Sequence, residues 1–207
     1  MISIIDHPLV QHKLSLMRNK NTDTKDFREL TLEISQMIGY EAMRKLRTST
    51  TEVETPLTKA IVPTIANTKI ALVPILRAGL IMAEGISKIV PSSIIGHIGI
   101  RRDPDTHLPI KYLNKLPNNI KDSKVFLLDP MLATGGSAIV AVNILKNEGV
   151  TDITFISILS SPEGISNFKK NHPEIDIFVA AVDEKLTKDL YIYPGLGDAG
   201  DRIFGTL

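Results

Sequence analysis

The segment Lys-Val-Phe-Leu-Leu-Asp-Pro-Met-Leu-Ala-Thr-Gly-Gly-Ser, residues 124–137, decides the fold. Its first part is a short continuous apolar run, which predicts a strand buried on both faces over Lys124–Leu128. Gly135 and Gly136 follow, and apolar residues at helical spacing come next over Ala138–Asn147. A strand, a glycine-rich turn and a helix in this order are typical of the repeating unit of a parallel α/β sheet.

The same alternation of apolar strands and helical patterns recurs on both sides of this segment. Further strands are predicted at Lys69–Leu76, Ser93–Ile100, Asp152–Leu159 and Ile175–Val182, and further helices at Leu80–Val90 and Pro162–Asn171. The alternation implies an α/β fold with a mainly parallel, twisted sheet flanked by helices. No linker, repeat or low-complexity tract divides the chain, so we expect a single domain over residues 1–207.

Three segments fall outside this alternation. Apolar residues at helical spacing predict a long N-terminal helix from Thr24 to about Leu46, with Asp23 or Thr24 as its cap. Thr48–Pro63 is rich in threonine and β-branched residues and contains an internal proline, a composition that favours a hairpin or an irregular arm. Arg101–Pro117 is polar and proline-containing, and it predicts a long loop or arm.

The bulk composition excludes several classes of protein. Hydrophobic residues make up 43% and charged residues 23% of the chain, which argues against global disorder. The net charge of +1 leaves no electrostatic footprint for nucleic acid or an anionic membrane, so we expect neither as a partner. The chain has no cysteine, which excludes disulfides, thiolate metal sites and a cysteine nucleophile. We find no secretory signal and no apolar stretch of membrane-spanning length, and therefore expect a cytoplasmic protein.

The glycine turn after the strand is the first candidate site. Ligands of open α/β sheets lie at the carboxyl ends of strands, and a glycine turn that opens a helix offers free N–H groups to a phosphate. Thr134 and Ser137 add hydroxyl donors, whereas Asp129 would repel a phosphate and is placed to bind ribose hydroxyls or a metal-bound water. The alternative is a plain strand-to-helix connection, which a bare Gly-Gly would favour. The acid and the flanking hydroxyls favour the phosphate site.

Two arginine segments are further candidates. Arg77 lies in Pro-Ile-Leu-Arg-Ala-Gly, residues 74–79, at another strand end that opens a helix, where it could clamp a second phosphate. The alternative is a solvated arginine, but apolar residues on both sides argue against it. Arg101 and Arg102 begin the polar segment that ends at Pro117, which is either a solvated mixed-charge loop or a mobile lid with a phosphate ligand.

The C-terminal run Tyr191–Arg202 is the fourth candidate. Its three glycines and one proline argue against regular structure, and glycine lets a backbone approach a flat ligand closely. A planar heterocycle could then be recognised by main-chain N–H and C=O groups. The alternative is a disordered polar tail, but Ile203 and Phe204 favour a packed loop.

These four segments, in this order, resemble the uracil phosphoribosyltransferase family, a branch of the type I phosphoribosyltransferases. The resemblance runs from His7-Pro8 to the end of the chain, and the run after Pro194 is its most specific part. It implies the type I phosphoribosyltransferase fold with an N-terminal helix and a β-arm or hood. It also implies pyrimidine salvage: uracil and 5-phospho-α-D-ribose 1-diphosphate (PRPP) give UMP and diphosphate, with Mg²⁺ as cofactor.

The resemblance also assigns residues. It implies catalytic roles for Arg102, Asp129 and Asp198, and counting back from Tyr112 favours Arg102 over Arg101. The implied PRPP site consists of Arg77, Arg102, Asp129, Pro130, Met131, Leu132, Ala133, Thr134, Gly135, Gly136, Ser137 and Asp198. The implied uracil site consists of Ile192, Gly197, Asp198 and Ala199. No metal ligands are implied, because Mg²⁺ is expected mainly on the substrate diphosphate.

This chain departs from the family pattern at three places. Pro130 follows Asp129, so one carboxylate replaces the adjacent pair of most of the superfamily, as in the uracil branch. The segment after Arg102 lacks the glutamates of the family loop, and Tyr193 replaces an aliphatic neighbour of the uracil site.

The resemblance suggests a homodimer or higher homo-oligomer through the N-terminal helix and the 48–63 arm. The sequence does not decide whether GTP activates this chain as it does some relatives. Rival functions are the same fold acting on a purine, a regulator that senses PRPP or binds RNA, and a plain nucleotide-binding module. A regulator would carry a DNA-binding domain or a basic patch, and neither is seen in the sequence.

Overall fold

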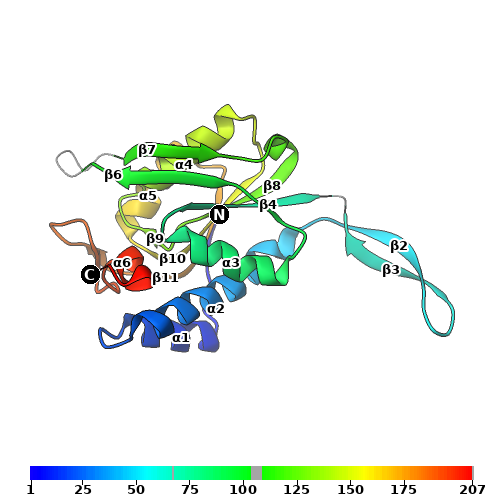
Figure 1. Ribbon diagram of the computed structural model, residues 1–207, viewed down its shortest axis with the longest axis horizontal. Helices are drawn as coiled ribbons and strands as arrows, with labels where there is room; N and C mark the ends of the chain where they lie inside the picture. The colour runs from blue at the N-terminus through cyan, green and yellow to red at the C-terminus, as the bar shows by residue number, and fades with distance from the viewer. Residues whose placement is uncertain (67, 104–108, 207) are drawn as a thin grey trace.

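The computed structural model describes residues 1–66, 68–103 and 109–206, apart from the side chain of Arg102. Its main sheet has the strand order β1-β11-β10-β8-β4-β6-β7 (Figure 1). These strands are β1 (Ile2–Ile4), β4 (Lys69–Leu76), β6 (His97–Arg102), β7 (Pro109–Lys115), β8 (Ser123–Leu128), β10 (Ile153–Ser160) and β11 (Asp176–Val182). The short strands β5 (Ile94–Ile95) and β9 (Met131–Leu132) pair with β4 and β10. All pairs are parallel except β6 with β7, which confirms the predicted sheet.

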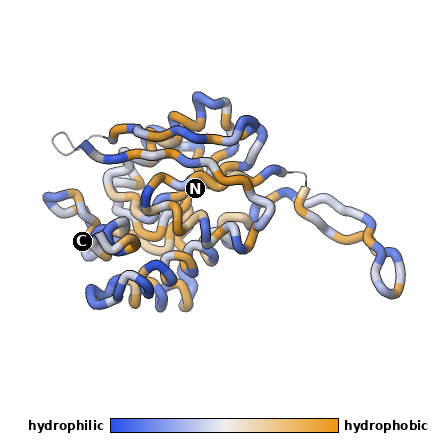
Figure 2. The backbone as a smooth tube through the Cα atoms, viewed as in Figure 1, coloured by the Kyte–Doolittle hydropathy of each residue, from blue (hydrophilic) through white to orange (hydrophobic). Residues whose placement is uncertain are grey.

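Helices cover both faces of the sheet. The described helices are α1 (Pro8–Arg18), α2 (Thr24–Ala42), α3 (Gly79–Ile89), α4 (Gly136–Asn147), α5 (Pro162–Asn171) and α6 (Ala199–Phe204), with 3₁₀ turns η1 (Met43–Lys45) and η2 (Ile120–Asp122). Successive strand residues point to opposite faces. In β8, Phe126 and Leu128 pack in the cluster under α1, α2, α3 and α6, whereas Val125 and Leu127 pack under α4 and α5. Figure 2 shows the apolar strands at the centre of the fold.

Local signals in the sequence set the helix boundaries. Asp23 caps α2, because its carboxylate accepts a hydrogen bond from the Asp26 N–H at 2.8 Å, so the predicted cap is confirmed. Helix α4 begins after Gly135, which adopts φ +82°, a left-handed conformation that glycine reaches without steric cost. Gly149 follows the end of α4 at φ +83°.

The segment after α2 forms an antiparallel hairpin of β2 (Thr48–Glu54) and β3 (Lys59–Ile65), as predicted. Figure 1 shows the hairpin projecting away from the rest of the fold. The apolar side chains of Val53, Ile61 and Ile65 in the hairpin are exposed, and Leu57 at the turn is 95% exposed. Figure 2 shows apolar stretches along this arm.

The expectation of a loop or arm over residues 101–117 is wrong where the structure has strands, at residues 101–102 and 109–115. Residues 109–115 form β7, which pairs antiparallel with β6 and lies at the edge of the sheet. Pro109 is the first residue of this edge strand, a position where its missing N–H is tolerated. Most of the expected lid, residues 104–108, lies outside the described residues.

The expectation that Tyr191–Arg202 contains no regular structure is also wrong. Ile192 and Tyr193 form β13, which pairs with β12 (Lys185–Leu186), and helix α6 begins at Ala199. The helix forms despite the nearby glycines because Asp198 caps it and Ile203 buries its apolar face. Within the described ranges, no helix is both long and apolar enough to cross a membrane.

Candidate active site

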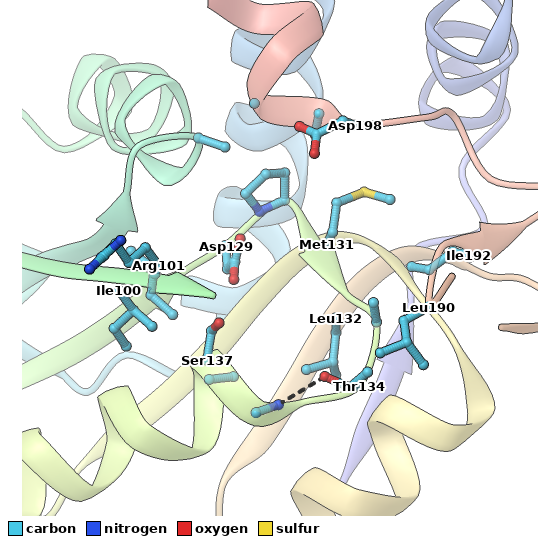
Figure 3. A pocket seen from close by; sticks show the side chains of 18 of the residues that line it. Ile100, Arg101, Asp129, Met131, Leu132, Thr134, Ser137, Leu190, Ile192 and Asp198 are labelled. Atoms are coloured by element: carbon cyan, nitrogen blue, oxygen red, sulfur yellow. Dashed lines mark hydrogen bonds between the residues drawn. The ribbon is translucent and has the colours of Figure 1, made fainter. Parts of the chain in front are cut away.

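A cleft of about 820 Å³ opens at the carboxyl ends of β4 and β8. It is lined by the loop that contains Arg77, the whole turn from Asp129 to Ser137, and residues 197–200 at the start of α6. Figure 3 shows the acidic, hydroxyl and apolar side chains that surround it. The cleft therefore brings together residues of all four predicted segments, at the edge of the sheet where ligands of this class of fold bind.

The turn from Thr134 to Ser137 forms the anion-binding end of the cleft. Because Gly135 caps α4, the N–H groups of Gly136, Ser137 and Ala138 belong to the first turn and have no helical carbonyl partner. The Gly136 N–H makes a long contact of 3.4 Å with the Thr134 hydroxyl, drawn as a dashed line in Figure 3. Free N–H groups at the positive end of the helix dipole suit a phosphate.

Asp129 follows the last residue of β8 and is half-buried. Its backbone N–H donates to the Ile156 carbonyl at 3.2 Å, which ties the residue to the neighbouring strand. Figure 3 shows its carboxylate between Ser137 and Asp198. This position suits a hydrogen bond to a sugar held between the two ends of the cleft.

Arg77 lies between β4 and α3, with a cis peptide bond to Leu76. Its side chain is 60% exposed, and its guanidinium is 3.8 Å from the Asp201 carboxylate and 5.7 Å from the centre of the Phe204 ring. An ion pair this long and exposed is weak. The guanidinium therefore stays available to an anion that enters the cleft beside α6.

The strand β6 brings two arginines to the cleft edge, and the structure describes the side chain of one. Arg101 lines the cleft and is exposed. Arg102 is the last residue of β6, but its side chain lies outside the described part of the structure. The choice of Arg102 over Arg101 as a donor ligand therefore stays a prediction.

The predicted uracil residues gather at the other end of the cleft. Ile192, Gly197, Asp198 and Ala199 all line it. Gly197 is exposed at φ +83°, whereas Ile192 and Ala199 are buried. One carboxylate oxygen of Asp198 accepts the Asp201 N–H at 2.9 Å, so Asp198 caps α6 in addition to facing the cleft. The sequence carries only a weak signal for this cap, because the apolar pair that follows it, Ile203-Phe204, is too short to show helical spacing.

Four other residues that line the cleft were not predicted as site residues, namely Ile100, Tyr112, Asp189 and Leu190. Tyr112 belongs to β7, where a loop was expected, whereas Ile100 lies in β6 at the end of the predicted strand Ser93–Ile100. By contrast, Tyr193 is not among the described lining residues, and its ring lies under the Lys185 ammonium at 5.4 Å. No group of three or more His, Asp or Glu side chains that could hold a metal occurs in the described ranges.

Comparison with solved structures defines the class of protein. The AQ2163 protein from Aquifex aeolicus is 36% identical with a TM-score of 0.94, over 99% of this chain and 98% of that chain. A hypoxanthine-guanine phosphoribosyltransferase from Bacillus anthracis shares the fold with a TM-score of 0.51 at 10% identity, over 77% of this chain and 80% of that chain. The fold is that of the type I phosphoribosyltransferases.

Sequence relatives then define the branch. A family model described as uracil phosphoribosyltransferase matches residues 4–206. A protein named uracil phosphoribosyltransferase from Dictyoglomus turgidum is 56% identical over 206 residues, covering 100% of both chains. Another of that name from Thermus thermophilus is 53% identical over 205 residues, covering 99% of each. The chain belongs to the uracil phosphoribosyltransferase family.

Proposed function

We propose that this chain transfers the 5-phosphoribosyl group of PRPP to N1 of uracil, giving UMP and diphosphate. The observation that carries the proposal is the single cleft that joins a phosphate-binding turn, an arginine loop and a glycine loop suited to a flat base. The full-length relatives named uracil phosphoribosyltransferase support the same reaction.

The chemical problem is to break the bond between C1 of the ribose and diphosphate. Negative charge grows on the leaving diphosphate while C1 becomes positive, so donors aimed at the diphosphate stabilise the transition state more than the ground state. Arg77 supplies such a donor beside α6. The turn at Thr134–Ser137 holds the 5-phosphate, and Asp129 accepts from the ribose hydroxyls between the two anionic groups.

Mg²⁺ is the cofactor that this chemistry implies. Mg²⁺ keeps several waters and is usually held by one or two carboxylates together with substrate phosphates. The carboxylates of Asp129 and Asp198 line the cleft and fit that role, either directly or through a bound water. When bound, the ion neutralises charge on the diphosphate.

Hydrogen-bond parity explains the choice of base. Uracil presents two acceptor oxygens on either side of one N–H, whereas cytosine has an amino donor in place of O4. A backbone N–H of the Gly197–Ala199 turn aimed at O4 would face that donor and stay unpaired. The turn should therefore reject cytosine strongly.

The direct test of the proposal is product analysis with purified protein, PRPP and a panel of bases. We expect Mg²⁺-dependent formation of UMP from uracil, and loss of the reaction when the metal is chelated. Cytosine, hypoxanthine and guanine should give no comparable turnover. A preference for a purine, or equal use of cytosine, would contradict the proposal; adding GTP to the same assay shows whether it activates the chain.

Paired variants of the two strand-end arginines assign the donor ligand. We expect Arg102→Ala to lower both kcat and the affinity for PRPP. The reason is that an arginine that closes on the bound diphosphate stabilises the transition state as well as the bound donor. The matched variant Arg101→Ala should have the smaller effect. An effect of Arg102→Ala confined to KM, or a larger effect of Arg101→Ala, would overturn the assignment.

The β2–β3 arm supports a homo-oligomer. Leu57, Ile61 and Ile65 are 95%, 74% and 50% exposed on a hairpin that stands away from the sheet. Exposed apolar side chains in a group mark an interaction surface. We expect light scattering to show a homodimer for the wild-type protein and a monomer for Ile61→Glu. If both proteins have the mass of a monomer, the prediction is wrong.

A further inference from the structure

The loop before α6 is held by an ion pair that no part of the reaction uses. Asp183, which follows β11, is one of the few buried charged residues, and its side chain is 6% exposed. Arg18, the last residue of α1, donates to both of its carboxylate oxygens at 2.7 and 2.6 Å. Burial of such a pair is costly unless its remaining hydrogen-bonding capacity is filled.

Gly195 fills that capacity. Its N–H donates to the Asp183 carboxylate at 2.8 Å, and its carbonyl accepts from the Arg18 guanidinium at 2.8 Å. The N–H and the C=O of Gly195 are therefore both hydrogen-bonded to the same ion pair. Gly195 adopts φ +66°, and a Cβ at this position would overlap the Ile192 carbonyl, so only glycine fits here.

A second arginine holds the next carbonyl. Arg202 donates to the Leu196 carbonyl at 2.7 Å, and also to the carbonyls of Met17 and Asn19 at 2.8 and 2.6 Å. Its guanidinium lies 4.2 Å from the centre of the Phe27 ring, and burial lowers its pKa from the usual value. A side chain held on four sides has little freedom to move.

Because the peptide group is planar, these contacts also set the direction of the N–H group that follows each carbonyl. In a trans peptide the N–H points opposite to the C=O of the preceding residue. The Leu196 carbonyl points to Arg202, so the N–H of Gly197 points the other way, and Gly197 lines the cleft. The Gly195 carbonyl likewise fixes the N–H of Leu196 away from Arg18.

We infer that Arg18, Asp183 and Arg202 form a clamp of positioning residues that aims the backbone of the 195–198 turn at the base. None of them lines the cleft, so each acts through the turn rather than by contact with the base. This inference rests on the proposed function, because it assigns the backbone of this turn to the base.

The test separates affinity for the base from affinity for PRPP. Arg18→Lys keeps a positive charge beside Asp183 but loses the fork that also reaches Gly195. We expect the KM for uracil to rise about 10-fold, the equivalent of one lost hydrogen bond to a charged group, while the KM for PRPP stays within about 2-fold. A purely structural role would lower the active fraction and hence the apparent kcat, with both KM values unchanged.

Two further variants keep the test decisive. Asp183→Asn should raise the KM for uracil in the same direction, and thermal unfolding reports any loss of fold. Asp152→Asn is the matched control, because that carboxylate is 65% exposed and pairs with Lys124 far from the cleft, so both KM values should stay unchanged. A folded Arg18→Lys protein with an unchanged KM for uracil overturns the inference. A wild-type protein that makes no UMP overturns the proposed function, and the inference with it.

Discussion

Gly164 offers a sharp test of how the phosphate turn is supported, because α5 packs directly behind it. A Cβ at Gly164 would lie closer than 3.0 Å to the carbonyl oxygens of Leu132 and Ala133, and both are backbone atoms that cannot rotate away. Ser161, the cap of α5, also donates to the Ala133 carbonyl at 2.6 Å. Gly164→Ala should therefore push the turn and the helix apart.

The size of the effect follows from two opposing terms. Overpacking of a tight contact costs about 1–3 kcal/mol, whereas Ala is favoured over Gly within a helix by up to about 1 kcal/mol. A net loss of about 1–2 kcal/mol should lower the melting temperature by roughly 2–8 °C for a chain of this size. The displaced turn should also weaken the binding of ribose 5-phosphate, since its N–H groups are aimed by the same contacts.

The assay is thermal unfolding together with calorimetric titration of ribose 5-phosphate. Gly136→Ala is the matched control for stability, because its Cβ would meet no atom closer than 3.7 Å. We expect Gly136→Ala to melt at or above the wild-type temperature. A Gly164→Ala protein with wild-type stability and wild-type phosphate affinity would refute the reasoning that close packing of α5 sets the turn.

Three further predictions concern single side chains. Ser161→Ala removes the cap of α5 and the bond to Ala133, so urea unfolding should show a loss of about 1–2 kcal/mol; no loss would contradict the cap. Burial and the nearby Lys146 ammonium lower the pKa of His172, so the unfolded chain binds the proton first and stability should fall as the pH drops below about 6.5. His172→Phe should flatten that pH dependence in urea titrations, and an unchanged slope would argue against it. Tyr193→Ile should leave the KM for uracil within about 2-fold, because Tyr193 packs under Lys185 outside the cleft; a larger change would place its side chain in the base site.

The sequence predicted the parallel sheet because its strands are continuous apolar runs with glycine turns between them. The strand at Lys69–Leu76 and the helix at Pro162–Asn171 have the predicted bounds. The edge strand β7 was missed because an exposed strand has no apolar run and Pro109 resembles a loop signal. Helix α6 was missed because its six residues are too few for a periodic pattern.

The residues that line the site were easier to predict than the residues that support it. Asp129 and the glycine turn stand next to a strand in the sequence, so their chemistry is visible locally. Arg18 and Asp183 are 165 residues apart and meet only after folding. No local pattern distinguishes them from solvated charges, which is why the clamp emerges only from the three-dimensional structure.

A crystal structure of the protein with UMP would show directly how the nucleotide lies in the cleft. We expect the phosphate to lie against the N–H groups of residues 134–137 and the edge of the base to meet the backbone of Gly197–Ala199. Asp129 should then accept a hydrogen bond from the ribose. A UMP bound in the reverse orientation, or outside this cleft, would show that the phosphate and base sites are wrongly assigned.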